Sequence, residues 1–454
     1  MNLPRILCVN ASLALSLNAY TPIASAHPTT LLDINCQNDV TLSGLKVRLK
    51  LENVYEGPHD MFCNNVGAPF VRKDYSGNFL GFIDSRGRSY TYTSTGQPVT
   101  YTSLPALDSV LEDERQKKQN AINAWGTISL TKRFVNDSLH EILPWDSPSL
   151  ARWDAQKPVK LYSLDRGSQN NAYFSPDNTG GSIHLFPLVN QRKQAIGSTA
   201  NDYEIVSHET GHNISDILRP HHNLMRPQTG AIDESFGDYI AFSTALSIDN
   251  IRKQFLKDTK GNLRRSSFLS ETAESLSQAT GLGIHGIRNA VNNFTLDGAA
   301  CEVHDLSRVF TGTLYDIFVG AFEEGSPRPW LFSRDELKDD EQINEVNGDL
   351  RALVLGAHCM VPYNNPTFAD YGHTMYSLAE NTSKYNYLSK FIPSSFENRG
   401  IDIFMGHNNF SICDKNAVAA HGGGGSKDNH ICGTLESLKK RTASRDAKSL
   451  QVVF

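Results

Sequence analysis

The 454-residue sequence lacks an apolar run long enough to cross a bilayer, which takes about 20 residues. Its stretch at residues 6–17 is apolar but shorter, and it follows Arg5 directly. The Ala-Ser-Ala sequence at residues 24–26 then matches a signal-peptidase site. We therefore expect residues 1–26 to be a cleaved signal peptide and the protein to be secreted, to the extracellular space or the periplasm, without a membrane span. An uncleaved amphipathic N-terminus is the alternative.

The sequence also lacks an excess of basic residues. It has 43 lysines and arginines against 49 aspartates and glutamates, a formal net charge of -6. We see no basic cluster of the kind that binds a phosphate backbone, so we expect no nucleic-acid partner. The hydrophobic content of 39% is that of an ordinary globular protein. The length predicts about two or three lobes.

Cysteine is scarce, and no two cysteines have the close spacing of a thiolate zinc site. Any metal must therefore be held by imidazole and carboxylate groups. Cys8 belongs to the predicted signal peptide, and an even number of cysteines then remains, which predicts disulfides in an exported chain. Proximity along the chain favours three pairs: Cys36 with Cys63, Cys301 with Cys359, and Cys413 with Cys432.

Hydrophobic periodicity divides the mature chain into three regions. Residues 27–105 are predicted to be β-rich, because leucine and valine alternate with charged residues over 45–52, as in a strand with one buried face. Residues 106–330 are predicted to form a central core region with helical segments. Residues 331–454 are predicted to be mostly helical, with a glycine-rich loop and a tail.

Helices are expected in two places within the predicted core. The segment 107–135 has few helix breakers. The segment 204–246 is expected to form two helices joined by a loop at 219–230, which contains prolines and a glycine.

The sequence His-Glu-Thr-Gly-His at residues 208–212 places two histidines four positions apart. On a helix, such side chains share one face with their Cβ atoms about 5 to 6 Å apart, so His208 and His212 can ligate one ion. Glu209 would then lie beside the metal without binding it, where a base for a zinc-activated water is needed. Taken alone, the pattern also fits two solvated histidines on a helix.

A third ligand is available downstream. Glu234 stands in the segment Gly-Ala-Ile-Asp-Glu-Ser-Phe-Gly-Asp, and two histidines with one glutamate form a recurrent catalytic zinc shell. Asp238 and Asp233 can accept hydrogen bonds from the ring nitrogens of His208 and His212, respectively. The alternative is a pair of surface carboxylates on a helix.

These motifs resemble those of the thermolysin-like zinc metallopeptidases, a gluzincin group that carries HExxH and, about twenty residues later, a glutamate in a Gly-Ala-Ile-Asn-Glu context. The resemblance covers about residues 110–320. It implies an α+β fold with a β-rich N-terminal lobe, a mainly helical C-terminal lobe and the zinc site between them. It also implies a secreted zinc endopeptidase that acts on protein or peptide substrates.

Two flanking segments extend the resemblance. Residues 170–174, Asn-Asn-Ala-Tyr-Phe, resemble the edge strand that binds an extended peptide in this family, and the matching positions are Asn171 and Ala172. The segment around His304 resembles the one that supplies a histidine to the oxyanion. The resemblance thus implies Glu209 and His304 as catalytic residues, although each flank also fits a segment without such a role.

Several features depart from the family pattern. The loop between the two zinc helices has no tyrosine, so a second oxyanion donor is absent unless His221 or His222 replaces it. Glu204 matches an acidic calcium ligand, but Ala245 stands where a second acid is expected, so calcium is not supported. Gly211 weakens the zinc helix by about 1 kcal/mol relative to alanine, which indicates a close neighbour.

Two alternatives to an endopeptidase stay open. The first is a catalytically inactive metallopeptidase-like binding or adhesion module, and the intact Glu209 argues against it. The second is a zinc hydrolase or aminopeptidase of other specificity. The expected cofactor is one catalytic Zn²⁺.

Overall fold

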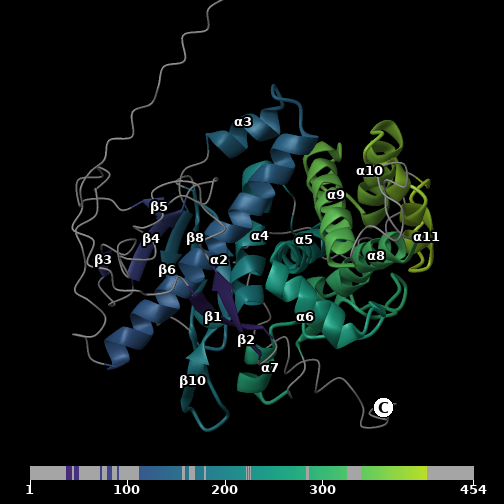
Figure 1. The fold of residues 1–454 in the computed structure, drawn as a ribbon. Coiled ribbons are helices and arrows are strands. Elements are labelled where there is room, and N and C mark those ends of the chain that lie inside the picture. The colour runs from purple at the N-terminus through teal and green to yellow at the C-terminus, as the bar shows by residue number, and fades with distance from the viewer. Residues whose placement is uncertain are drawn as a thin grey trace, which may run out of the picture.

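The computed structural model describes residues 37–42, 45–50, 72–73, 79–83, 89–90, 112–155, 159–162, 169–177, 180–220, 222, 224, 226–282, 286–324 and 339–405. Small sheets form in the earlier part of the chain and mainly helices in the later part, so an α+β fold is confirmed (Figure 1). The predicted signal peptide, glycine-rich loop and tail lie outside the described residues. Among the described helices, none is both long and apolar enough to span a membrane.

The strands are short. They are β1 (Gln37–Leu42), β2 (Leu45–Lys50), β3 (Arg72–Lys73), β4 (Phe79–Ile83), β5 (Ser89–Tyr90), β6 (Val159–Tyr162), β7 (Ala172–Ser175), β8 (Ser182–Leu185), β9 (Pro187–Val189), β10 (Ala195–Ser198), β11 (Glu271–Thr272) and β12 (Arg288–Asn289). The largest sheet has the order β3-β4-β6-β8-β7, with β5 also paired to β4. Its β6–β8 pair is parallel and its other pairs are antiparallel. β7 therefore lies at an edge of the described sheet.

The helices occupy the later part of the chain, apart from α2 and α3. They are α2 (Glu112–Ile142), α3 (Pro148–Asp154), α4 (Tyr203–Leu218), α5 (Pro227–Leu246), α6 (Asp249–Thr259), α7 (Glu274–Thr280), α8 (Val303–Glu324), α9 (Asp339–Met360), α10 (Phe368–Asn381) and α11 (Phe391–Glu397). The helix expected over 107–135 is confirmed from Glu112 and continues to Ile142, and the two helices expected within 204–246 are confirmed. The loop expected at 219–230 is shorter than predicted, because Pro227 starts α5: its fixed φ and missing N–H suit the first turn of a helix.

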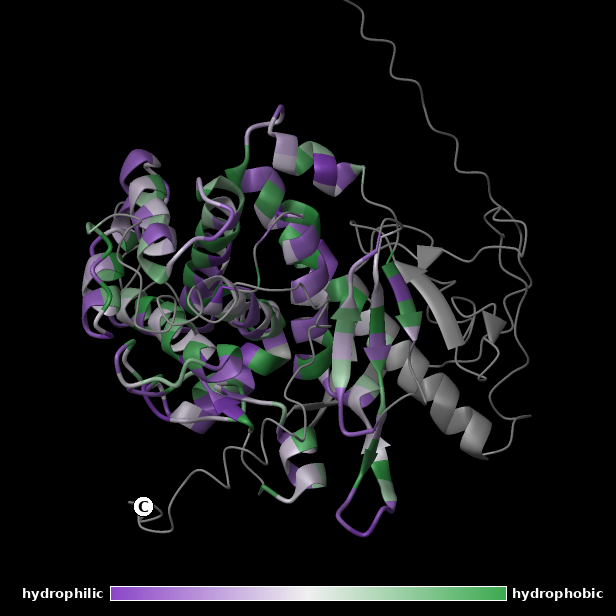
Figure 2. Cartoon of the chain, turned by 180° about the vertical axis from the view of Figure 1, so that it is seen from behind, coloured by the Kyte–Doolittle hydropathy of each residue, from purple (hydrophilic) through white to green (hydrophobic). Residues whose placement is uncertain are grey.

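Helix α5 lies at the centre of the helical part. Every residue of α5 is buried, and it packs against α4, α8 and α9. A helix enclosed on all sides needs no polar face, and small or apolar residues occupy most of its length. Hydrophilic residues gather instead in surface segments such as the tip of the β9–β10 hairpin, residues 190–194 (Figure 2). Side chains that α5 presents to α4 are consequently removed from bulk water.

Helix α4 is fixed at its start and along its side. At its start, the Asp202 carboxylate accepts hydrogen bonds from the first backbone N–H groups, which have no partner within the helix. The Ser207 hydroxyl bonds to that of Thr131 on α2 at 3.0 Å. The Asn213 amide donates to the carbonyl of Gly180, beside the sheet, at 3.1 Å. These contacts set the rotation of α4 about its axis.

Two glycines allow α4 and α5 to approach closely. A Cβ atom at Gly211 would lie 2.7 Å from the Cα of Gly237, and one at Gly237 would lie 2.7 Å from Nδ1 of His208. Real Cβ atoms do not approach so closely, so each position requires glycine. The close neighbour that Gly211 predicts is confirmed, and it is the backbone of α5.

The cysteine pairing differs from the prediction. Cys359, near the end of α9, has a free thiol, whereas Cys301 is disulfide-bonded. The predicted pair of Cys301 with Cys359 is therefore wrong, because proximity along the chain does not set proximity in space. The other two predicted pairs lie outside the described residues. Burial raises the pKa of the Cys359 thiol to about 12, so this thiol is unreactive at neutral pH.

We predict that Gly211→Ala lowers the free energy of unfolding by about 1 to 3 kcal/mol, the usual cost of overpacking, because its methyl group meets the backbone of α5. Gly348→Ala in α9 is the matched control, since a Cβ there meets nothing within 4 Å. It should instead stabilise the helix by about 1 kcal/mol. Urea unfolding measures both, and equal effects would contradict the close contact.

Candidate metal centre

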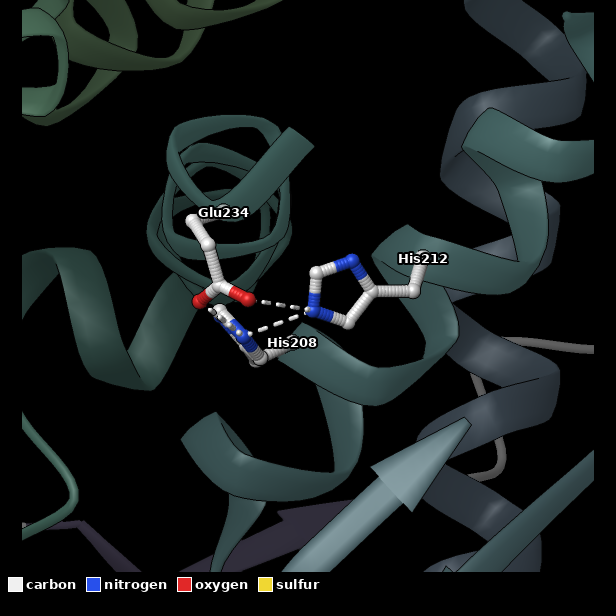
Figure 3. Close-up of side chains that lie close together, drawn as sticks. All are labelled: His208, His212 and Glu234. Atoms are coloured by element: carbon white, nitrogen blue, oxygen red, sulfur yellow. Dashed lines mark hydrogen bonds and ion pairs between the residues drawn. The ribbon is translucent and has the colours of Figure 1, made fainter. Parts of the chain in front are cut away.

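His208 and His212 face the same point from one side of α4. They lie one helical turn apart, with exposed fractions of 1% and 2%, and their Nε2 atoms are 3.0 Å from each other. Figure 3 shows both rings turned toward α5, where Glu234 approaches them from the neighbouring helix. Two imidazole nitrogens directed at one point are the first requirement of a metal site.

Glu234 completes a group of three donors. Its Oε2 lies 3.5 Å from Nε2 of His208, and its Oε1 lies 3.6 Å from Nε2 of His212 (Figure 3). Ligands bound to a tetrahedral zinc ion at 2.0–2.1 Å lie about 3.3 Å from each other. The donor spacing and the mixture of nitrogen and oxygen therefore fit a divalent transition metal. Among the histidine, cysteine and carboxylate side chains of the described residues, His208, His212 and Glu234 form a group that could hold an ion.

A carboxylate faces the outer nitrogen of each histidine. Nδ1 of His212 donates to Oδ2 of Asp233 at 2.7 Å, and Nδ1 of His208 lies 3.0 Å from Oδ1 of Asp238. Burial alone would lower the pKa of His212, but the Asp233 carboxylate outweighs it and raises that pKa. A proton held on Nδ1 leaves the Nε2 lone pair free for an ion. Asp233 and Asp238 thus orient both imidazoles.

Arg288 is a site residue that the sequence analysis missed. Its Nη1 donates to Oε2 of Glu234 at 3.1 Å and to Oδ2 of Asp238 at 3.2 Å, and its side chain is 7% exposed. Burial alone would raise the pKa of Asp238, but the Arg288 guanidinium and His208 together outweigh it and lower that pKa. Arg288 lies on β12, in a segment without a motif. A cation was nevertheless to be expected, since buried carboxylates need compensating charge.

Glu209 differs from the other carboxylates of the site. It is fully buried, and neither carboxylate oxygen has a hydrogen-bond partner among the described residues. Burial raises its pKa above the ordinary value, although the neighbouring His208 and His212 oppose the shift. An unpaired buried carboxylate is unfavourable for stability. Glu209 therefore places a buried carboxylate without a hydrogen-bond partner beside the two histidines.

His304 faces the site from the start of α8. Its Nε2 lies 3.5 Å from Oε1 of Glu234, and its Nδ1 hydrogen-bonds to Glu302. Burial alone would lower the pKa of His304, but the carboxylates of Glu234 and Glu302 outweigh it and raise that pKa. The ring is 14% exposed, so it lies at the boundary between the donor group and the surface. Its Nε2 can serve as a hydrogen-bond donor there.

Asn171 and Ala172 lie at the start of edge strand β7, which packs beside α4. The carbonyl of Asn171 accepts from Thr199 at 3.2 Å, which fixes its backbone. Oδ1 of Asn171 has no hydrogen-bond partner among the described residues. A peptide could therefore contact this strand through its backbone, because β7 lies at an edge of the described sheet.

A small pocket opens beside His212. Its lining includes Phe174 and Pro176 from the end of β7, and His222 and Leu224 from the loop between α4 and α5. Both ring nitrogens of His222 are buried without a hydrogen-bond partner among the described residues. Burial lowers the pKa of His222 to about 4, so its ring is neutral at pH 7. His221 lies outside the described residues.

No protein-family model matches the chain, and no curated protein matches it as a relative. The expected ligands His208, His212 and Glu234 nevertheless come together in space, with Glu209 and His304 next to them. The geometry supports a buried metal site that could belong to a metalloenzyme.

We predict that the protein binds about one equivalent of a divalent transition metal and that His212→Ala loses it, because only two donors remain. His373→Ala, at an exposed position on α10, is the control and should keep the metal. Elemental analysis after gel filtration measures the content. A full equivalent retained by His212→Ala would contradict the assignment.

Proposed function

We propose that the protein is a secreted zinc-dependent endopeptidase. The observation that carries the proposal is the juxtaposition of a two-histidine, one-glutamate donor group with the unpaired carboxylate of Glu209. The donor group resembles a catalytic zinc shell, which binds the ion through three protein ligands and keeps a fourth position open. The HExxH spacing on α4 supports the same reading.

His208, His212 and Glu234 would hold the ion. A bound Zn²⁺ would act as a Lewis acid on water and on the peptide carbonyl. Glu209 would accept a proton from the attacking water and pass it to the leaving amine. Glu209 follows His208 directly on α4, and its carboxylate has no other hydrogen-bond partner among the described residues, so it would be available to that water.

His304 would donate a hydrogen bond to the oxygen that becomes negative during attack. The carboxylates of Glu234 and Glu302 favour the protonated ring, which is the form that donates through Nε2. A well-placed donor of this kind is worth about 3 to 4 kcal/mol in the transition state. His222 is placed on the pocket beside His212 and would be the candidate for a second donor.

Asn171 and Ala172 would bind the substrate backbone. An edge strand such as β7 can pair with an extended peptide, which then lies alongside α4 and its histidines. A protein or peptide substrate is therefore proposed rather than a compact small molecule.

The principal alternative is a metal-containing binding module without activity. Such a module requires the three ligands but has no use for a buried carboxylate without a partner. Replacing Glu209 by a neutral residue would relieve its desolvation, so its presence favours an enzyme over the module.

We predict that Glu209→Gln keeps its metal and fold but loses peptide cleavage by about 10²- to 10⁴-fold, the usual effect of removing a general base. Glutamine is nearly isosteric and cannot accept the proton. Glu380→Gln, an exposed position on α10, is the control and should cleave at the wild-type rate. His304→Ala should lower turnover by less. A metal-loaded Glu209→Gln that cleaves like wild type would favour the binding module.

For localisation, we predict that protein recovered from its native host begins at His27, after cleavage of residues 1–26. Intact-mass measurement of the exported fraction tests this directly. An N-terminal peptide that still contains Met1 would show that the signal is not removed. Thiol labelling after denaturation should modify Cys359, which is free in the structure.

A further inference from the structure

Hydrogen bonds continue outward from His212 beyond Asp233. Asp233 uses Oδ2 for His212, and its Oδ1 accepts from the hydroxyl of Ser215, one turn further along α4. The same hydroxyl oxygen lies 3.1 Å from Nε2 of His358 on α9, which is 143 positions away in the sequence. Ser215, Asp233 and His358 are all buried, with exposed fractions of 1%, 3% and 0%. A chain of three side chains thus connects a metal ligand to a distant helix.

The direction of each hydrogen bond follows from the donors available. A carboxylate only accepts, so Ser215 must give its single hydroxyl proton to Asp233. Nε2 of His358 must then carry the proton that it donates to the Ser215 oxygen. Nδ1 of His358 has no partner among the described residues, which agrees with a neutral ring protonated on Nε2. The series of hydrogen bonds therefore ends at His358, whose ring must carry its proton on Nε2.

His358 is itself held in place. Its ring stacks on that of Phe236 from α5, with centroids 4.2 Å apart and planes inclined by 24°. Its backbone carbonyl accepts from the guanidinium of Arg219 at 3.1 Å. A buried ring fixed on two sides is a rigid anchor, unlike a serine hydroxyl alone, which can rotate.

We propose that Ser215 and His358 are positioning residues of the metal centre. They hold the carboxylate of Asp233 in one orientation, and Asp233 in turn holds the ring of His212 with Nε2 toward the ion. The proposal depends on the metal site but not on peptidase activity, so a metal-binding protein without activity would still test it. Outer partners of this kind change metal affinity by about 10- to 100-fold when they are removed.

The first test measures the Zn²⁺ affinity of Ser215→Ala by competition with a chromogenic chelator. We expect a loss of about 10-fold relative to wild type. The matched control is Ser235→Ala, which removes another buried serine hydroxyl, next to Glu234, that donates to the carbonyl of Ser307 at 2.7 Å. This control should lose stability but keep its Zn²⁺ affinity. Equal losses of affinity in both variants would overturn the proposal.

The second test uses Co²⁺ as a spectroscopic probe and two substitutions of His358. His358→Gln retains an N–H at the reach of Nε2 and should keep the visible spectrum and most of the affinity. His358→Leu removes the donor and should change both. If both His358 variants match wild type in spectrum and affinity, the proposal is wrong. Should His358→Leu fail to fold, the comparison of Ser215→Ala with Ser235→Ala decides.

A double-mutant cycle distinguishes a specific effect of Ser215 on Asp233 from a general loss of packing around the site. With Asp233→Asn in place, the Ser215 hydroxyl no longer has a carboxylate to orient, so adding Ser215→Ala should weaken Zn²⁺ binding by less than about twofold. If the losses of Zn²⁺ affinity in the two single variants add up in the double variant, Ser215 does not act through Asp233. Wild-type protein that binds neither Zn²⁺ nor Co²⁺ would refute the metal site and this proposal together, whereas lack of cleavage alone would refute only the proposed activity.

Discussion

The contact of Gly211 with Gly237 is the constraint on which the site depends. Packed helices ordinarily lie 8 to 10 Å apart, at a distance set by the side chains between them. Without side chains at these two positions, α4 and α5 meet backbone to backbone, and the short side chain of Glu234 can reach both histidines of α4. Two glycines weaken both helices, but the complete burial of α5 offsets this, since tertiary packing supplies most helix stability.

Charge is the second organising feature of the centre. Four carboxylates are buried within it, those of Glu209, Asp233, Glu234 and Asp238. Arg288 compensates part of this charge through its contacts with Glu234 and Asp238. Burying such an excess of negative charge is unfavourable unless cations compensate it. A divalent ion between the three donors would supply that compensation, which is an electrostatic reason for metal binding independent of the donor spacing.

The hydrogen bonds that connect Asp233, Ser215 and His358 extend the centre into the later part of the protein. Helix α9 supplies His358 to this chain and the carbonyl that Arg219 binds, so α9 contributes to the surroundings of His212 although it carries no ligand. A site formed by α4 and α5 is thereby coupled to a third helix. Because the buried hydrogen bonds from His358 through Ser215 to Asp233 restrict the orientation of that carboxylate, α9 can preorganise the ligand before an ion arrives.

The sequence by itself determined the residues whose relation is local. Spacing of four on a helix identified His208 and His212, resemblance to a known motif identified Glu234, and the helices of the core followed from periodicity. Tertiary structure alone decided the partners that lie far apart in the chain. Arg288 and His358 belong to segments without a motif, and Cys359 is a free thiol although its order along the chain favoured a pair with Cys301. Hydrophobic periodicity predicts which face of a helix or strand is buried, but it does not predict which distant element covers that face. The packing of α4, α5 and α9 against one another supplies that information.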